Sequence, residues 1–285
     1  PVHPKVVKKM EDVSRQDYGN PSSVYSSGRV AKSIIEEARS QIARMIDASP
    51  SEIYFTGSGT EANNIVLWSM LYNEKKHVIT SAIEHPAVLK VLEELQYFGV
   101  TFDVLPVDST GLVDPKDVEM AIKKDTGMIS IMYVNNEIGT IQSLQKLIEI
   151  SKKRSILFHS DCVQVIGKLP LSVLKIEADY MSFSAHKFYG PKGIGFLYRR
   201  KGAPLRPLVI GGGQESNIRA GTENISGIAG LGVAAKLAYQ NLNSRIDHLF
   251  QLEKYFKNNI IQKLPHIIFN GNNDQHIPGL CSITI

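Results

Sequence analysis

Residues 53–68 read IYFTGSGTEANNIVLW, and this stretch decides the fold class of the chain. Ile53–Thr56 is apolar or β-branched, as in a buried strand, and Gly57–Thr60 is rich in turn-forming residues. Glu61 then begins a segment with helical spacing of apolar residues that reaches Trp68. The order strand, glycine-rich turn, helix is the building unit of a sheet with parallel strands.

The same order repeats along the chain. An amphipathic helix is expected over Val30–Ile46, before this stretch. After it, strands are expected at Val78–Ser81, Phe102–Leu105, Met128–Val134, Ile156–His159, Tyr180–Phe183 and Gly195–Arg199, and helices at Pro86–Phe98, Pro115–Lys123 and Leu144–Lys153. This alternation predicts an α/β fold with a mostly parallel central sheet flanked by helices.

A long helical pattern follows the glycine cluster Gly211–Gly213. It runs from about Ile225 to Leu264, with an interruption near Asn241–Asn243. We interpret this helix as a link between two domains. The expected division is an N-terminal segment at 1–14, a large domain at 15–245 and the start of a small, incomplete C-terminal α+β domain at 246–285.

The composition is that of an ordinary globular protein. Hydrophobic residues make up 43% of the 285 residues and charged residues 21%, with a formal net charge of +4. No basic cluster indicates a nucleic-acid groove, and no apolar run is long enough to span a bilayer. Two cysteines form no disulfide framework, so a reducing cytoplasm is the expected location, and no metal site is expected. Neither end has the pattern of a natural terminus, so we expect both ends to be cut.

Gly57-Ser58-Gly59-Thr60 precedes a helix, and two interpretations of it stay open. The free backbone N–H groups and the positive end of the helix dipole would bind a phosphate. A plain strand-to-helix turn with Thr60 as N-cap would use the same residues. The stretch fits neither the Walker A pattern nor Gly-x-Gly-x-x-Gly, which favours a phosphate-bearing cofactor other than a nucleotide.

Ser184-Ala185-His186-Lys187 places a lysine directly before the turn-forming Tyr189-Gly190-Pro191. A deprotonated lysine amine does carbonyl chemistry, and lysine shifts its pKa readily when it is buried or close to other cations. The Ser184 hydroxyl and the His186 imidazole would hold a phosphate beside it. A solvated surface lysine is the alternative.

Other polar residues lie just after expected strands, where ligands bind in an open α/β sheet. Asp161 would pair with a protonated ring nitrogen, or it is a helix N-cap or a hydrogen-bonding aspartate of the core. Gln164 would face the same pocket. His85 would stack on an aromatic cofactor and exchange protons, or it is an ordinary turn residue. Asn135 and Asn136 are either turn formers or hydrogen-bond partners of a ligand.

Pyridoxal 5'-phosphate (PLP) is the common cofactor that needs all these parts together. Its aldehyde needs an amine, its ring nitrogen an acid, its ring a stacking partner and its phosphate a cup of donors. The sequence therefore predicts PLP as the cofactor.

The chain resembles the NifS/IscS-type cysteine desulfurases, members of the class V aminotransferase family with PLP-dependent transferase fold type I. The resemblance covers nearly all 285 residues. The matching segments are Tyr18–Ser23, Gly59–Glu61, Glu84-His85, Val134–Gly139, Asp161 with Gln164, Ser182–Lys187, Gly190–Gly195, Gly211–Glu215 and Arg219–Asn224.

The resemblance implies roles for the matching residues. Lys187 would hold the cofactor covalently and later move the α-proton of the substrate, with His85 as a second catalytic residue stacked on the ring. Asp161 would pair with the pyridine nitrogen. Asn136 and Gln164 would contact the phenolic oxygen of the cofactor. Its phosphate would be bound by Gly59, Thr60, Ser184 and His186. Thr222 of a second subunit would also bind the phosphate.

The resemblance also implies the reaction. L-Cysteine would become L-alanine while its sulfur passes to an enzyme thiolate as a persulfide. A cytoplasmic homodimer would then supply an acceptor or scaffold protein in iron–sulfur cluster assembly or tRNA thiolation. Direct binding to nucleic acid or membrane is not expected.

The cysteines depart from the family pattern. The catalytic cysteine is expected in a loop well past the strand that contains Cys281, and the arginine for the substrate carboxylate beyond Ile285. We interpret Cys281 as a strand residue and Cys162 as a small buried residue. The sequence would then be part of a longer protein or a naturally shortened relative. Two alternatives stay open: another class V enzyme, such as an aminotransferase or a β-lyase, and a non-catalytic binding protein.

Overall fold

The computed structural model describes all residues from Pro1 to Ile285. Its centre is a seven-stranded sheet in the order β1-β7-β6-β5-β4-β2-β3. The strands are β1 (Ile53–Thr56), β2 (His77–Ser81), β3 (Thr101–Leu105), β4 (Thr126–Ser130), β5 (Leu157–Asp161), β6 (Tyr180–Ser184) and β7 (Gly195–Arg199). β7 runs antiparallel to β1 and β6, whereas β2 to β6 pair in parallel. The predicted α/β class with a mostly parallel sheet is confirmed.

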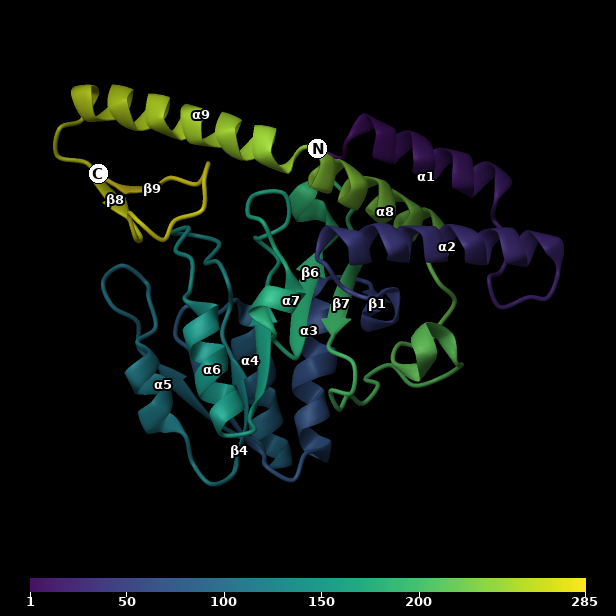
Figure 1. Cartoon of the computed structure of the whole chain (residues 1–285), viewed down its shortest axis with the longest axis horizontal. Helices are drawn as coiled ribbons and strands as arrows, with labels where there is room; N and C mark the ends of the chain where they lie inside the picture. The colour runs from purple at the N-terminus through teal and green to yellow at the C-terminus, as the bar shows by residue number, and fades with distance from the viewer.

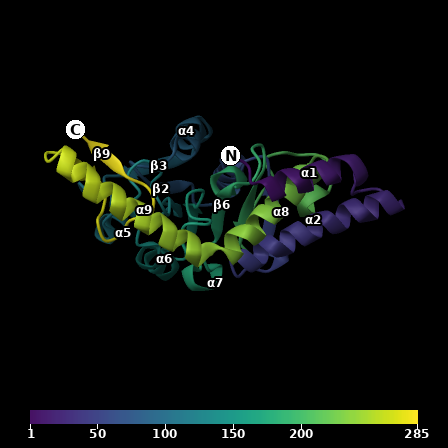
Figure 2. The same ribbon diagram turned by 90° about the horizontal axis from the view of Figure 1, so that it is seen from above.

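Helices cover both faces of this sheet, with α4 on one side and α5, α6 and α7 on the other (Figure 2). The α-helices are α1 (Pro4–Gln16), α2 (Ser26–Met45), α3 (Gly59–Trp68), α4 (Pro86–Leu95), α5 (Pro115–Ala121), α6 (Leu144–Lys153), α7 (Val173–Ile176), α8 (Ile225–Gln240) and α9 (Leu242–Lys263). Short 3-10 turns are η1 (Pro50–Glu52), η2 (Ser69–Tyr72), η3 (Gln96–Phe98), η4 (Ala185–Phe188) and η5 (Gln214–Asn217).

The inner strands β2, β4, β5 and β6 bury side chains on both faces of the sheet, since successive side chains point to opposite sides, whereas the edge strand β3 stays partly exposed. Val78 and Met128 belong to a smaller core together with residues of α3 and α4. Their neighbours Ile79 and Ile129 belong to a larger core together with residues of α2, α5 and α6. The polar residues of these strands, such as Thr80, Ser130 and His159, are buried as well and are hydrogen-bonded inside the sheet.

α8 is apolar around most of its circumference because α1 and α2 pack against it (Figure 1). A side chain at Gly232 would lie 2.7 Å from Ala38 of α2, and one at Gly230 would lie 2.7 Å from Met10 of α1. These two glycines allow the three helices to approach closely. No helix in the structure combines the length and apolar character needed to cross a membrane.

The chain leaves the large sheet through α9, as Figure 1 shows. The predicted interruption of the long helix is confirmed, since α8 ends at Gln240 and α9 begins at Leu242.

A two-stranded antiparallel sheet of β8 (Ile268–Asn270) and β9 (Ser282–Thr284) follows. The division into segments 1–14, 15–245 and 246–285 stays a prediction.

Several predicted boundaries were wrong. β4 ends at Ser130 rather than Val134, and beyond it the N–H of Met132 donates to the Glu84 carboxyl group at 2.8 Å. The helix predicted to reach Phe98 becomes a 3-10 turn after Leu95, and the one predicted to reach Lys123 ends at Ala121.

The two ends of the chain also differ from prediction. α1 was not predicted, although His3 caps it and Pro4 occupies its first position, both common helix-start signals. Its Val6 and Val13 are buried. Cys281 directly precedes β9 instead of lying within it.

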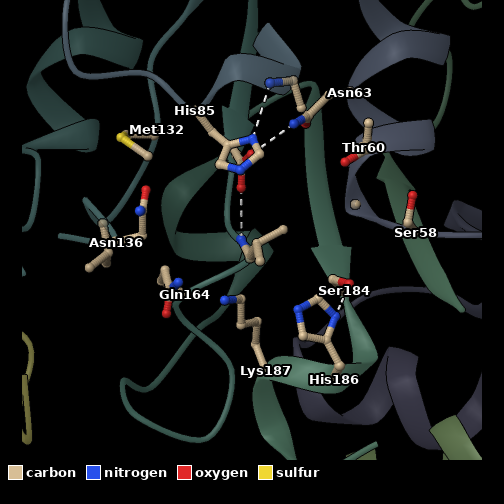
Figure 3. A pocket seen from close by; sticks show the side chains of 15 residues that line it. Ser58, Thr60, Asn63, His85, Met132, Asn136, Gln164, Ser184, His186 and Lys187 are labelled. Atoms are coloured by element: carbon tan, nitrogen blue, oxygen red, sulfur yellow. Dashed lines mark hydrogen bonds between the residues drawn. The ribbon is translucent and has the colours of Figure 1, made fainter. Parts of the chain in front are cut away.

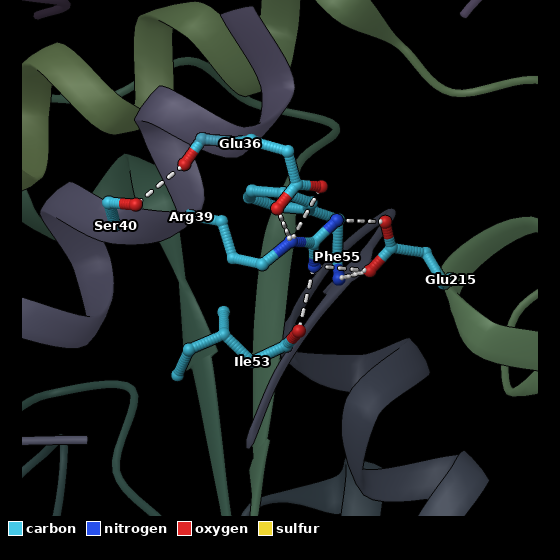
Figure 4. A network of polar contacts seen from close by, with 6 residues as sticks. All are labelled: Glu36, Arg39, Ser40, Ile53, Phe55 and Glu215. Atoms are coloured by element: carbon cyan, nitrogen blue, oxygen red, sulfur yellow. Dashed lines mark hydrogen bonds and ion pairs between the residues drawn. The ribbon is translucent and has the colours of Figure 1, made fainter. Parts of the chain in front are cut away.

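The loop between β7 and α8 has a strained backbone and is held in place by an ion pair. Glu215, Ser216 and Asn217 all have positive φ angles, of 45°, 55° and 65°. The Arg39 guanidinium of α2 donates to both oxygens of Glu215 at 2.9 and 2.7 Å, and the Phe55 N–H of β1 donates to Glu215 Oε2 at 2.7 Å (Figure 4). One carboxylate therefore connects the loop to α2 and β1.

We expect Glu215→Gln to lower the free energy of unfolding by about 1–3 kcal/mol. The variant replaces one carboxylate oxygen, a charged hydrogen-bond acceptor, by an NH2 group, so that a donor then faces the donors of Arg39. Urea unfolding measures the change. Glu11→Gln, which removes the exposed Arg15 pair, is the matched control and should change stability by less than about 1 kcal/mol. Equal effects of the two variants would contradict this account of the loop.

Candidate active site

The structure brings together nine of the ten predicted site residues in one pocket of about 190 Å³ (Figure 3). The pocket lies at the carboxyl ends of parallel strands and at the N-terminus of α3. The nine residues are Gly59, Thr60, His85, Asn136, Asp161, Gln164, Ser184, His186 and Lys187. No group of three or more His, Cys, Asp or Glu side chains is arranged to hold a metal ion.

The tenth residue, Thr222, does not line this pocket. It is exposed and lies beside a separate hollow lined by Gly57 and Arg219, among others. Its predicted contact through a second subunit stays a prediction.

The N-terminus of α3 supplies free donors. Ser58 is the N-cap rather than Thr60, because its Oγ accepts from the Glu61 N–H at 3.1 Å. The N–H groups of Gly59 and Thr60 have no acceptor within the chain. A Cβ at Gly59 would lie 2.6 Å from Val163 and 3.4 Å from Ser184. The absence of a side chain thus lets this helix end approach the end of β6.

Asp161 is the last residue of β5 and is 7% exposed. Its Oδ2 accepts from the side-chain amide of Asn63 at 2.7 Å, and its Oδ1 accepts from the Val163 N–H at 3.0 Å. Burial raises the pKa of this carboxyl group, and the hydrogen bonds from Asn63 and Val163 oppose the rise.

His85 caps α4, and its Nδ1 accepts from the Ala87 N–H at 3.0 Å. In the neutral ring the proton is therefore on Nε2. The cap fixes the ring in the pocket, above the level of Lys187 in the view of Figure 3.

Lys187 lies on the 3-10 turn η4, directly after β6. Its side chain is exposed to the pocket. The neighbouring Ser184 Oγ and His186 Nδ1 lie 2.9 Å apart, so one hydrogen bond joins the two predicted phosphate ligands. Burial, the Lys187 ammonium and Lys192 lower the pKa of His186.

Lys168 was not predicted, yet it fixes the orientation of Gln164. Its ammonium donates to Gln164 Oε1 at 2.9 Å. The amide nitrogen of Gln164 is then left to donate into the pocket. Burial and the Lys187 ammonium lower the pKa of Lys168.

The two adjacent asparagines have different roles, so both open interpretations apply. Asn135 forms the turn, because its Oδ1 accepts from the N–H groups of Glu137 and Ile138. Asn136 lines the pocket.

Glu84, next to His85, is a buried acid that connects the end of β2 to the segment after β4. Its Oε1 accepts from Ser81 Oγ at 2.6 Å and from the Met132 N–H at 2.8 Å, and its Oε2 is buried without a partner. Burial raises the pKa of this carboxyl group from 4.5 to about 8.

This pKa predicts a pH dependence of stability. Between about pH 4.5 and 8 the folded chain keeps a proton that the unfolded chain has lost. The free energy of unfolding therefore falls as pH rises, by up to about 1.4 kcal/mol per unit. Glu84→Gln should remove this slope, which urea unfolding at pH 5.5 and 7.5 would measure. The exposed Glu119→Gln is the control, and equal slopes in wild type and Glu84→Gln would refute the assignment.

Neither cysteine lines the pocket. Cys162 is fully buried, and burial raises the pKa of its thiol well above the usual range. Burial also raises the pKa of Cys281. Cys162 is thus a buried residue, as predicted, and neither environment favours a thiolate.

Two further polar pocket residues were not among the predicted site residues: Ser58, which belongs to the predicted Gly57–Thr60 turn, and Asn63. The Ser-x-x-Glu spacing of Ser58 and Glu61 is typical of helix starts and would have found the cap. Asn63 lies on the face of α3 that also carries Val66, where an apolar residue is expected. A polar residue on a buried helix face is the signal for it.

Comparison with known proteins gives the family. Residues 1–285 match the family described as aminotransferase class-V, and the chain belongs to it.

It is 44% identical to "Cysteine desulfurase IscS" of Dictyoglomus turgidum, and the match covers 98% of this chain and 72% of that protein. The solved structure of a "NifS-like protein" has a TM-score of 0.93 and 39% identity, covering 97% of this chain and 77% of the other. The structure "SspA in complex with cysteine" has a TM-score of 0.80 and 38% identity, and the match covers 83% of this chain and 70% of the other. The predicted resemblance to NifS/IscS-type cysteine desulfurases, and with it fold type I, is confirmed.

Proposed function

We propose that the protein is a PLP-dependent cysteine desulfurase. The observation that carries this proposal is the shared pocket of Lys187, Asp161 and the N-terminus of α3. An amine, a buried acid and a set of free N–H donors then face one cavity. The names of the relatives support the same reaction.

The residues of the pocket fit PLP. The free N–H groups of Gly59 and Thr60, with the Ser184–His186 pair, suit a phosphate. A side chain at Gly59 would collide with Val163, so the cup depends on glycine. The side-chain oxygen of Asn63 is buried in the pocket wall without a partner, which marks this wall as polar and not fully satisfied by the chain alone.

Each side chain then has a distinct task. Lys187 would hold the cofactor and carry the α-proton of the substrate, and Asp161 would face the ring nitrogen. The fixed ring of His85 would stack on the cofactor, with its Nε2 proton toward the pocket. Asn136 and the amide nitrogen of Gln164 would donate to the phenolic oxygen. When bound, PLP supplies an electron sink that stabilises negative charge at the α-carbon.

The reaction proposed is a sulfur transfer. L-Cysteine and a thiol of the enzyme give L-alanine and an enzyme persulfide: the C–S bond of cysteine breaks, an S–S bond forms, and one proton ends on the alanine methyl group. The relative crystallised "in complex with cysteine" supports L-cysteine as substrate. Thr222 of a second subunit as a phosphate ligand, a cytoplasmic homodimer, and an acceptor protein for iron–sulfur assembly or tRNA thiolation complete the proposal.

Product analysis tests this function against the alternatives. The PLP-loaded protein is incubated with L-cysteine, a reductant and 2-oxoglutarate. Alanine and sulfide in equal amounts are the expected products. Pyruvate with sulfide would indicate a β-lyase, glutamate an aminotransferase, and no product together with no α-proton exchange on bound L-cysteine a binding protein, and each of these outcomes would overturn the proposal.

A further inference from the structure

Asn63 is a fully buried amide in the wall of the pocket. Its Nδ2 donates to Asp161 Oδ2 at 2.7 Å, a short bond between the middle of α3 and the end of β5. Its Oδ1 is also buried and has no hydrogen-bond partner. The amide is thus satisfied on one side only.

The orientation of this amide is determined by its neighbour. Turning it over would bring the carbonyl oxygen against the Asp161 carboxylate, two acceptors with no proton between them. The nitrogen must therefore face Asp161, and the oxygen must be left free. A buried polar atom without a partner costs about 1–3 kcal/mol.

The fold itself does not need an amide at this position. The nearby residues of α3 that face the smaller core are apolar and buried: Ala62, Ile65 and Val66. Leucine has the same branching and the same number of side-chain heavy atoms as asparagine, and it has no polar atom to satisfy. Asn63 therefore serves Asp161 rather than the packing of α3.

We propose that Asn63 is a positioning residue that orients the Asp161 carboxylate toward the pocket and stabilises its anion through the 2.7 Å hydrogen bond. With the Val163 N–H on the other oxygen, both carboxylate oxygens have a fixed donor. The pocket is then prepared for a positively charged ring nitrogen before any ligand enters. This inference rests on the proposed function for the identity of that ring.

The inference predicts two changes in one variant, in PLP binding and in the ionisation of Asp161. Asn63→Leu removes the unsatisfied oxygen and the donor to Asp161 Oδ2 together, so the two effects on the thermal midpoint of unfolding oppose each other. The same variant should weaken PLP binding at least about 10-fold, measured by absorbance titration. In the cofactor-free protein, its Asp161 should ionise at a pH at least about one unit higher, measured by carbon NMR of labelled aspartate carboxyl groups. Asp161→Asn identifies the signal.

Asn64→Leu is the matched control on the same helix. The Asn64 amide donates only to the Thr60 carbonyl oxygen at 2.9 Å and does not line the pocket. This variant should change neither PLP affinity nor the ionisation of Asp161.

The outcomes separate this inference from the proposed function. An unchanged ionisation of Asp161 in Asn63→Leu would overturn the positioning role whatever PLP does. If wild-type protein binds no PLP but the ionisation shifts as stated, the positioning role stands and the proposed function fails.

Discussion

Replacing Lys187 with alanine should lower the rate of α-proton exchange on bound L-cysteine by at least about 10³-fold. The pocket has other basic groups, but Lys187 is the lysine that lines it, and an amine is needed both for covalent attachment and for proton transfer. Exchange is followed in deuterium oxide by proton NMR with PLP-loaded protein. This readout needs no sulfur acceptor.

Lys187→Arg sharpens the test, because arginine keeps the positive charge but does not deprotonate in proteins. We expect the same loss as with alanine. The exposed Lys175→Ala on α7 is the control and should exchange at the wild-type rate. Substantial exchange by Lys187→Arg would show that charge alone is required and would remove Lys187 from the chemistry.

Asp161→Ala should lower the same exchange rate on the order of 10²–10³-fold, because a fixed charge beside the proposed ring nitrogen is lost. The free energy of unfolding should change by less than the activation free energy that corresponds to this loss of rate. The substitution leaves the Asn63 amide and the Val163 N–H without an acceptor, but it also removes a carboxylate that burial disfavours.

Asp161→Asn keeps the shape of the side chain and serves as the second variant. Its exchange rate should fall nearly as far as that of Asp161→Ala, with a thermal midpoint closer to wild type. Unchanged exchange together with a lower midpoint in both variants would show that Asp161 is structural.

Much of the site was predictable because its residues follow strands. Asp161, His85 and Asn136 come at or just after β5, β2 and β4, and parallel strands bring their carboxyl ends to one edge of the sheet. Lys187 follows β6 in the same way. Local sequence order and the sheet topology together were sufficient for these positions.

The supporting residues were not predictable, because their roles depend on contacts between distant segments. Asn63 and Asp161 are 98 positions apart, Glu84 and Met132 are 48 apart, and the Arg39–Glu215 pair spans 176. No local pattern reports such a pairing.

The errors at the element ends have the same origin. β4 was predicted to continue to Val134 because its sequence stays apolar, but the Met132 N–H has the Glu84 carboxyl group as its acceptor instead. An acceptor from the loop after β2 overrides local preference at that point.

The central claim is that Lys187 carries the cofactor, and reduction followed by peptide mapping tests it most directly. The protein is incubated with PLP, treated with borohydride to make the lysine–cofactor bond permanent, digested, and analysed by mass spectrometry. We predict one modified peptide, with the adduct on Lys187, and none in Lys187→Ala. An adduct on another lysine, or no adduct on the wild-type protein, would contradict the account.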